Sequence, residues 1–110
     1  MLFRSATAAD WRAALASGSY TTSTLGRTLE EEGFIHASRA DQWRGVLAAF
    51  YGDVTEPLVL LEIDTDRLTA RVVEEPPVAG AAETFPHVYG PIDVGAVVDA
   101  TVVRPDEVSA

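Results

Sequence analysis

Apolar side chains recur at helical spacing in two segments of the chain. Trp11, Ala14 and Leu15 fall on one helical face. Thr7 precedes them as a cap residue, and Gly18 follows them as a terminator. The spacing i, i+3, i+4, i+7 is followed more closely downstream, by Trp43, Val46, Leu47 and Phe50. These patterns predict a helix of about ten residues near the N-terminus and a second helix over 43–50.

Shorter runs have the apolar character of β-strands. Residues 58–63 are apolar except for Glu62, which predicts a central strand buried on both faces. Residues 97–103 are rich in valine and form the last predicted strand. Further strands are predicted at 2–5, 34–37, 70–74 and, as an extended arm, 85–91.

Polar and glycine-containing segments separate these runs. Residues 27–32 read as a short helix closed by Gly33, and Ser38 with Asp41 three residues later reads as an N-cap pair. Residues 64–67 predict a turn, and residues 76–80 break the strand before them. The order of elements predicts a single compact α+β domain over residues 1–110, with small mixed or antiparallel sheets and two to three helices.

Composition narrows the class of protein. Of the 110 residues 47% are hydrophobic and 23% charged, and no apolar run approaches the ~20 residues of a membrane-spanning helix. The N-terminus lacks the pattern of a secretory signal, so we expect a cytoplasmic protein that does not contact membranes. The absence of cysteine excludes disulfides, thiolate catalysis and cysteine-bound metals.

Charge is distributed unevenly along the chain. The 8 basic residues are all arginine, and the 17 acidic residues bring the net charge to −9. Residues 1–52 carry five arginines and five acids, whereas residues 53–110 carry three arginines and twelve acids. This balance argues against duplex nucleic acid as a partner. A small anion remains compatible with the first half, where the first cations to consider are Arg4, Arg27, Arg39 and Arg44.

Both histidines have a hydroxyl residue two positions away. Alternation along a strand places His36 and Ser38 on one face, and likewise His87 and Tyr89. Prolines at 86 and 91 restrict the backbone around the second pair, which predicts a rigid extended arm. A histidine near its ordinary pKa of ~6.5 can act as a general acid or base at neutral pH.

Structural roles for the same residues stay open. His36 could be a core histidine bonded to a carbonyl, Ser38 a helix cap, and Tyr89 a packing residue. A two-histidine metal site has no third ligand at motif spacing, so no metal is expected. A serine hydrolase would need a sharp turn of the G-x-S-x-G kind, which the sequence lacks.

Two spaced motifs carry a family resemblance, Gly33-Phe34-Ile35-His36-Ala37-Ser38 and Phe85-Pro86-His87-Val88-Tyr89-Gly90-Pro91. With these motifs the chain resembles, nearly end to end, a bacterial family of short uncharacterised proteins, the domain of unknown function nine-five-two. The resemblance implies a fold related to the ADP-ribosyltransferases, and closest to the RNA 2′-phosphotransferases. In that larger group the strand histidine and its serine or threonine neighbour contact the ribose and nicotinamide side of NAD.

The resemblance assigns roles to particular positions. It implies that His36 and Ser38 contact a ligand, and it places Arg4 where many members have a histidine. Transferases that modify proteins use a glutamate late in the chain, and Glu74 and Glu75 hold that position. The catalytic candidates are therefore His36, His87 and Glu74. The ligand-binding candidates are Ser38, Tyr89, Arg4, Tyr20 and Arg27.

The sequence supports more than one functional hypothesis. In the first, a cleft binds NAD, an ADP-ribose-like nucleotide or a related small molecule and transfers or hydrolyses a group. In the alternative, a non-catalytic module keeps the fold and binds a small ligand or another protein. A purely structural role for the two histidines is the third reading. The sequence leaves the oligomeric state open.

Overall fold

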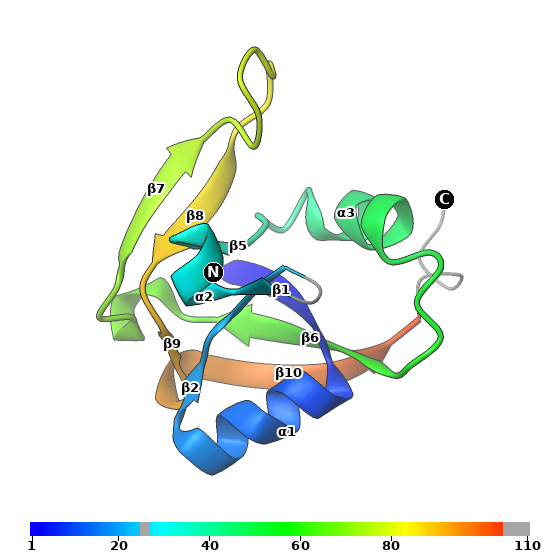
Figure 1. The fold of residues 1–110 in the computed structure, drawn as a ribbon, viewed down its shortest axis with the longest axis vertical. Helices are drawn as coiled ribbons and strands as arrows, with labels where there is room; N and C mark the ends of the chain where they lie inside the picture. Colours follow the sequence, from blue (N-terminus) through cyan, green and yellow to red (C-terminus); the bar gives the residue numbers. More distant parts are fainter. Residues whose placement is uncertain (25–26, 105–110) are drawn as a thin grey trace.

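The computed structural model describes residues 1–24 and 27–104 of the chain. Its larger sheet is antiparallel, and β6 (Leu58–Ile63) lies between β1 (Leu2–Thr7) and β10 (Val97–Val103) (Figure 1). The predicted central strand is therefore confirmed, but its predicted burial on both faces is not, because Leu60 and Glu62 are only partly buried. Its apolar run suits this place because both neighbours supply backbone hydrogen bonds while alternate side chains enter the core.

The second three-stranded sheet carries both histidines. Its order is β5 (Ile35–His36), β8 (Phe85–Tyr89) and β7 (Arg71–Glu75), all antiparallel. The rigid extended segment predicted over 85–91 is confirmed as β8 over its first five residues, and pairing on both sides makes this strand the middle of a sheet. Pro86 is tolerated there although it has no N–H, and its carbonyl accepts from the Ala37 N–H at 3.0 Å.

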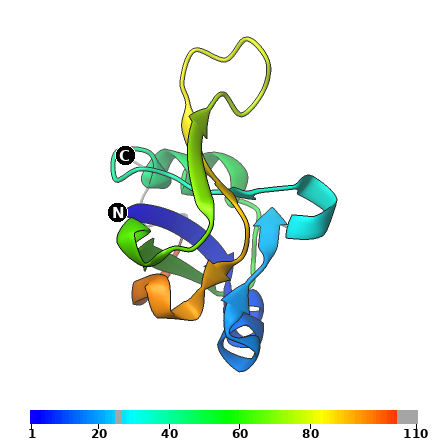
Figure 2. The same cartoon turned by 90° about the vertical axis from the view of Figure 1, so that its left-hand side faces the viewer.

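The β7–β8 hairpin projects away from the larger sheet. Figure 2 shows the loop at its tip standing clear of the other elements. Strand β5 lies between the hairpin and helix α3 (Figure 1).

Within the described residues three α-helices complete the architecture, and all begin close to predicted positions: α1 (Ala8–Ser17), α2 (Leu29–Glu32) and α3 (Trp43–Phe50). Thr7 caps α1 by accepting from the Asp10 N–H at 3.1 Å, and Gly18 ends this helix in the left-handed region at φ 93°. The short helix begins two residues later than expected, after a capping box of Thr28 and Glu31.

The N-cap predicted at Ser38 is wrong. Helix α3 begins at Trp43, after Gln42, and Gln42 makes no capping hydrogen bond. The Ser38 backbone instead exchanges two 2.8 Å hydrogen bonds with Phe3 of β1. Ser38 thus fastens the histidine-bearing strand to the larger sheet.

Short elements fill the remaining connections. Two-stranded antiparallel pairs are formed by β2 (Ser19–Tyr20) with β9 (Ile92–Asp93), and by β3 (Thr22–Thr24) with β4 (Arg27–Thr28). Single 3-10 turns are η1 (Thr65–Arg67) and η2 (Val94–Ala96). Several small antiparallel sheets with few helices confirm the predicted α+β class. No described helix is long and apolar enough to cross a membrane.

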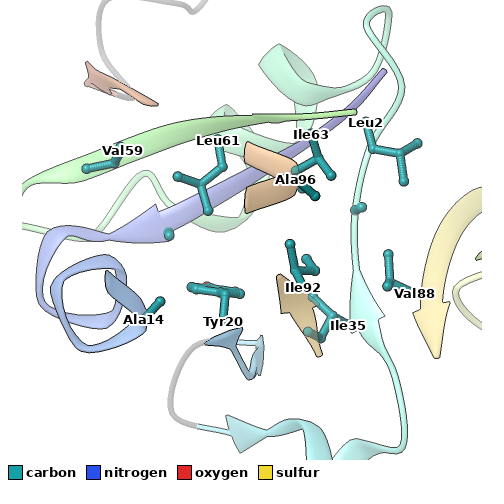
Figure 3. Packing of buried hydrophobic residues seen from close by; sticks show 12 residues of the cluster. Leu2, Ala14, Tyr20, Ile35, Val59, Leu61, Ile63, Val88, Ile92 and Ala96 are labelled. Carbon is teal, nitrogen blue, oxygen red and sulfur yellow. The ribbon is translucent and has the colours of Figure 1, made fainter. Parts of the chain in front are cut away.

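The main core lies between the two sheets and α1. Figure 3 shows Leu61 and Ile63 of β6 facing Tyr20, Ile92 and Ile35, which come from other elements. A smaller cluster joins α3 to the start of β6 through Leu47, Tyr51 and Leu58. The two clusters meet along β6, so this strand supports both halves of the molecule.

We expect Leu61→Ala to lower the free energy of unfolding by about 2–5 kcal/mol, because Leu61 is fully buried and its truncation leaves a cavity. The matched control is Leu15→Ala, since Leu15 is 53% exposed and should change stability by less than about 0.5 kcal/mol. Urea unfolding followed by circular dichroism measures both. Equal losses in the two variants would contradict the assignment of the core.

Candidate functional site

A cleft of about 520 Å³ lies between α3 and the β7–β8 hairpin. Its apolar walls are Phe3, Trp43, Val46, Phe50, Tyr51 and Phe85. Its polar side chains are Arg4, Ser5, His36 and Ser38, and the turn residues Pro77 and Val78 close one side. An apolar cavity with a few convergent polar groups is the usual form of a small-molecule site.

Arg4 is a buried cation in the wall of this cleft. Its Nε donates to the Tyr20 hydroxyl at 3.3 Å, and its terminal nitrogens donate to the carbonyls of His36 at 3.0 Å and Thr22 at 3.4 Å. All three acceptors are neutral oxygens, so none of them balances the positive charge of the guanidinium. Burial raises the pKa of Tyr20, although Arg4 acts in the opposite direction.

The two histidines lie side by side on one face of the smaller sheet. His36 and His87 are register partners, and their ring centroids are 4.9 Å apart in a T-shaped arrangement. Phe34 stacks on His87 at 4.2 Å and meets His36 edge-on at 4.8 Å. The register between β5 and β8 brings the two histidines together, which alternation within each strand could not predict.

His36 is half-buried and lines the larger cleft. Burial lowers the pKa of its imidazole, and the neighbouring His87 and Arg4 lower it further. At neutral pH this ring is uncharged and offers one donor and one acceptor nitrogen. It can therefore hydrogen-bond to a hydroxyl of a ligand in either direction.

His87 belongs to a second hydrogen-bonded group. Its Nδ1 lies 2.9 Å from the Glu75 Oε1, and because a carboxylate only accepts, Nδ1 carries a proton. The Tyr89 hydroxyl donates to the same oxygen. These hydrogen bonds, with that of Tyr89 the stronger influence, lower the pKa of Glu75. Donation to Glu75 in turn raises the pKa of Tyr89.

The remaining nitrogen of His87, Nε2, is buried and has no hydrogen-bond partner within the described residues. A buried polar atom without a partner is uncommon in native proteins and often marks a functional group. His87 as a whole is only 2% exposed. It lines a second hollow of about 390 Å³, together with Phe34, Glu75, Tyr89 and residues 76–79.

Glu74 lies on the opposite face of β7 from Glu75. It accepts from Arg39 at 2.5 Å and from the Thr84 hydroxyl at 3.2 Å, so the structure places it apart from the histidines. Glu75 is the carboxylate that joins them. The sequence shows both residues, but only the pairing of Val73 with His87 reveals which of the two shares the histidine face.

Gln42 is a contact that the sequence analysis did not single out. Its amide nitrogen donates to Glu83 and to the Thr84 carbonyl, both at 2.9 Å, and Arg39 also reaches that carbonyl at 3.2 Å. Arg39 and Gln42 precede α3, so they fasten the start of this helix to the β7–β8 hairpin. No sequence pattern indicated this role, because Arg39 and Gln42 lie in a segment that was predicted only to cap a helix.

The predicted ligand-binding residues divide into three groups. Arg4 and Ser38 line the larger cleft with His36, and Tyr20 lies behind Arg4 as its hydrogen-bond partner. Tyr89 lines the smaller hollow. Arg27 is exposed, pairs with Glu32 at 3.5 Å and lines neither space. Among the described residues, no three His, Asp or Glu side chains gather closely enough to hold a metal ion.

A profile of the family described as "Protein of unknown function (DUF952)" matches residues 5–100, which include both histidine strands and the lining of the larger cleft except Phe3 and Arg4. The chain belongs to the DUF952 family. The resemblance seen in the two sequence motifs is thereby confirmed at the level of this family. A comparison with curated proteins gives no match.

The fold of this DUF952 protein is similar to a crystal structure of protein CC0527 from Caulobacter crescentus. The TM-score is 0.77 at 27% sequence identity, and the match covers 94% of this chain and 85% of that one. A structure of a double mutant of CC0527 has the same TM-score and coverage at 26% identity. The α+β architecture is therefore shared with an experimentally determined structure.

We expect the DUF952 chain to lose stability as the pH falls below about 6.5, partly because of His36. Since its pKa is lower in the folded protein, the unfolded chain binds more protons in this range, and the free energy of unfolding decreases with acidification. The lowered pKa of Glu75 acts in the same direction, but only below its ordinary value of 4.5.

Urea midpoints near pH 7.5 and pH 5.5 separate the His36 effect from the rest. His36→Gln should show a smaller decrease in midpoint than the unmodified protein, because glutamine does not titrate. Equal decreases would show that His36 is not the group responsible.

Proposed function

We propose that this protein binds a nucleotide-derived small molecule in the larger cleft, with NAD and ADP-ribose-like nucleotides as the first candidates. The observation that carries the proposal is the buried Arg4 guanidinium in the wall of an aromatic cleft. A cation held in this way attracts an anionic group such as phosphate. The aromatic walls suit a planar ring on the same ligand.

The charge of Arg4 supports an anionic ligand. Buried charges are normally paired with an opposite charge, yet the three acceptors of Arg4 are two carbonyls and a phenol. Within the described part of the chain, no carboxylate forms an ion pair with Arg4. A phosphate in the cleft would add the missing negative charge.

The remaining cleft residues fit the other parts of a nucleotide. Phe3 and Trp43 stack with their centroids 6.2 Å apart, and Phe85 lines the same space. A base could pack against these apolar faces. The uncharged His36 and the Ser38 hydroxyl stand beside Arg4, where they can bond to sugar hydroxyls.

Our proposal includes a relation to the ADP-ribosyltransferase-like fold, and with it a group-transfer or hydrolytic reaction in the cytoplasm. The motifs around His36 and His87 support that relation. In such a reaction His36 would contact the ligand directly, while His87 and a nearby glutamate would act as further polar groups. The exposed pair of Glu74 with Arg39 makes Glu75 the better placed carboxylate.

A binding role without catalysis is the second candidate. The specific observation in its favour is the burial of His87, whose Nε2 is closed to solvent. A general acid or base must come within hydrogen-bond reach of the proton that it transfers. A protein that holds its second histidine in this way can bind a ligand and leave it unchanged.

Titration with NAD, ADP-ribose and nicotinamide tests the proposal. Trp43 lines the cleft, so its fluorescence should change on binding, and Trp11→Phe leaves it as the sole tryptophan of the two in the chain. Arg4→Gln should weaken binding of the phosphate-containing probes about 10–100-fold, as expected for the loss of a charged hydrogen bond.

The matched control is Arg27→Gln, which removes an arginine that lines neither space and should leave affinity unchanged. Circular dichroism establishes that Arg4→Gln is folded, and if it is not, Ser38→Ala replaces it with an expected loss of several-fold. No binding of any probe by the folded, unmodified protein would overturn the proposal. Chromatography of the probes after long incubation distinguishes a reaction from binding alone.

A further inference from the structure

The smaller hollow combines one carboxylate with several aromatic faces. Its volume is about 390 Å³, and Phe34, His87 and Tyr89 line it together with Glu75. The turn over residues 76–79 forms the remaining wall. The hollow is separate from the Arg4 cleft, although Pro77 and Val78 contribute to both.

Glu75 has unused capacity to accept hydrogen bonds. The bonds from His87 and Tyr89 both end on Oε1, and Oε2 has no partner among the residues that the structure describes. The Glu75 side chain is 32% exposed, so a ligand can reach its carboxylate. Its carboxylate is ionised at neutral pH, because the same hydrogen bonds favour the charged form.

The aromatic rings add negative potential around this carboxylate. Aromatic faces attract cations through their quadrupole. Tyr89 already does so, since the Arg71 guanidinium carbon lies 5.7 Å from its ring centroid. Phe34 is tilted against Tyr89 at 5.4 Å and stacked on His87, so the three rings form one continuous aromatic surface.

His87 reinforces this arrangement. Its Nδ1 donates to Glu75 and so holds that carboxylate beside the rings. Its own ring stacks on Phe34 and lines the hollow, whereas the buried Nε2 is out of reach of a ligand. The histidine therefore orients Glu75 toward a cation in the hollow.

We propose that this hollow binds an organic cation of the ammonium class. An organic cation fits better than a metal ion, because the hollow presents apolar rings and one carboxylate, whereas hard metal ions require several oxygen ligands. Aromatic rings around a carboxylate recognise an alkylated ammonium through cation–π attraction and through its charge. The positive group beside the site is Arg71, which competes for the Tyr89 ring.

Choline and its neutral isostere 3,3-dimethylbutan-1-ol provide the direct comparison. The two probes have nearly the same shape, but only choline is charged. In NMR titrations at neutral pH, choline should shift the signals of Tyr89 and Val78 and bind about tenfold more tightly than the alcohol. Equal affinity for the two probes would overturn the proposal.

Two neighbouring carboxylates of β7 provide matched variants. Glu75→Gln should remove the preference for choline, whereas Glu74→Gln should retain it, because Glu74 faces Arg39 on the opposite side of the strand. Both substitutions change the net charge equally. If Glu74→Gln lowers the preference as much as Glu75→Gln, the attraction comes from the net charge of −9 and the assigned site is wrong.

Substitutions at Tyr89 keep the proposal testable if Glu75→Gln does not fold. Tyr89→Phe should retain most of the preference for choline, since the ring remains, and Tyr89→Leu should lose it. The exposed position of Tyr89 makes both changes compatible with folding. Identical behaviour of the phenylalanine and leucine variants would exclude a role for the aromatic face.

Discussion

The hydrogen bonds of the buried Arg4 guanidinium connect the elements around the larger cleft. Arg4 projects from β1, and its three acceptors belong to Tyr20, Thr22 and His36, which lie in β2, β3 and β5. A buried cation is tolerated only if its N–H groups are satisfied, so each of these segments must hold its oxygen in place. The same constraint fixes the backbone of His36 relative to the larger sheet. The positions of Arg4 and His36 in the lining of the cleft are therefore set by the fold before any ligand binds.

The β7–β8 hairpin is held in place by polar contacts near its loop end. Arg39 and Gln42 bind Glu74, Glu83 and the Thr84 carbonyl, and so join the hairpin to the segment that leads into α3. Above these contacts, Pro77 and Val78 form a wall shared by the two spaces. A ligand in either space would contact this turn.

Local patterns in the sequence predicted the elements well, and non-local pairing accounts for what they missed. The helix over 43–50 and the strand over 97–103 are encoded by their own periodicity and were found with the observed bounds. The 85–91 segment was predicted as a rigid extended arm because prolines restrict its backbone, and only pairing with β5 and β7 shows that it is a middle strand. Glu74 and Glu75 are indistinguishable without the register of β7 and β8, since adjacent residues on a strand face opposite sides. Alternation within one strand did predict that His36 and Ser38 lie together, because it needs no knowledge of the partner strands.

The uneven charge of the chain becomes a gradient across the candidate site. The first half of the sequence supplies Arg4 to the larger cleft, and the acidic second half supplies Glu75 to the smaller hollow. The two histidines stand between these charges, with His36 on the arginine side and His87 bonded to the carboxylate. The two spaces therefore favour opposite charges, because a ligand group of the wrong sign would meet like charge in either of them. The net charge of −9 thus says little about the site, whereas the placement of one arginine and one glutamate on either side of the Pro77–Val78 turn determines which charge each space favours.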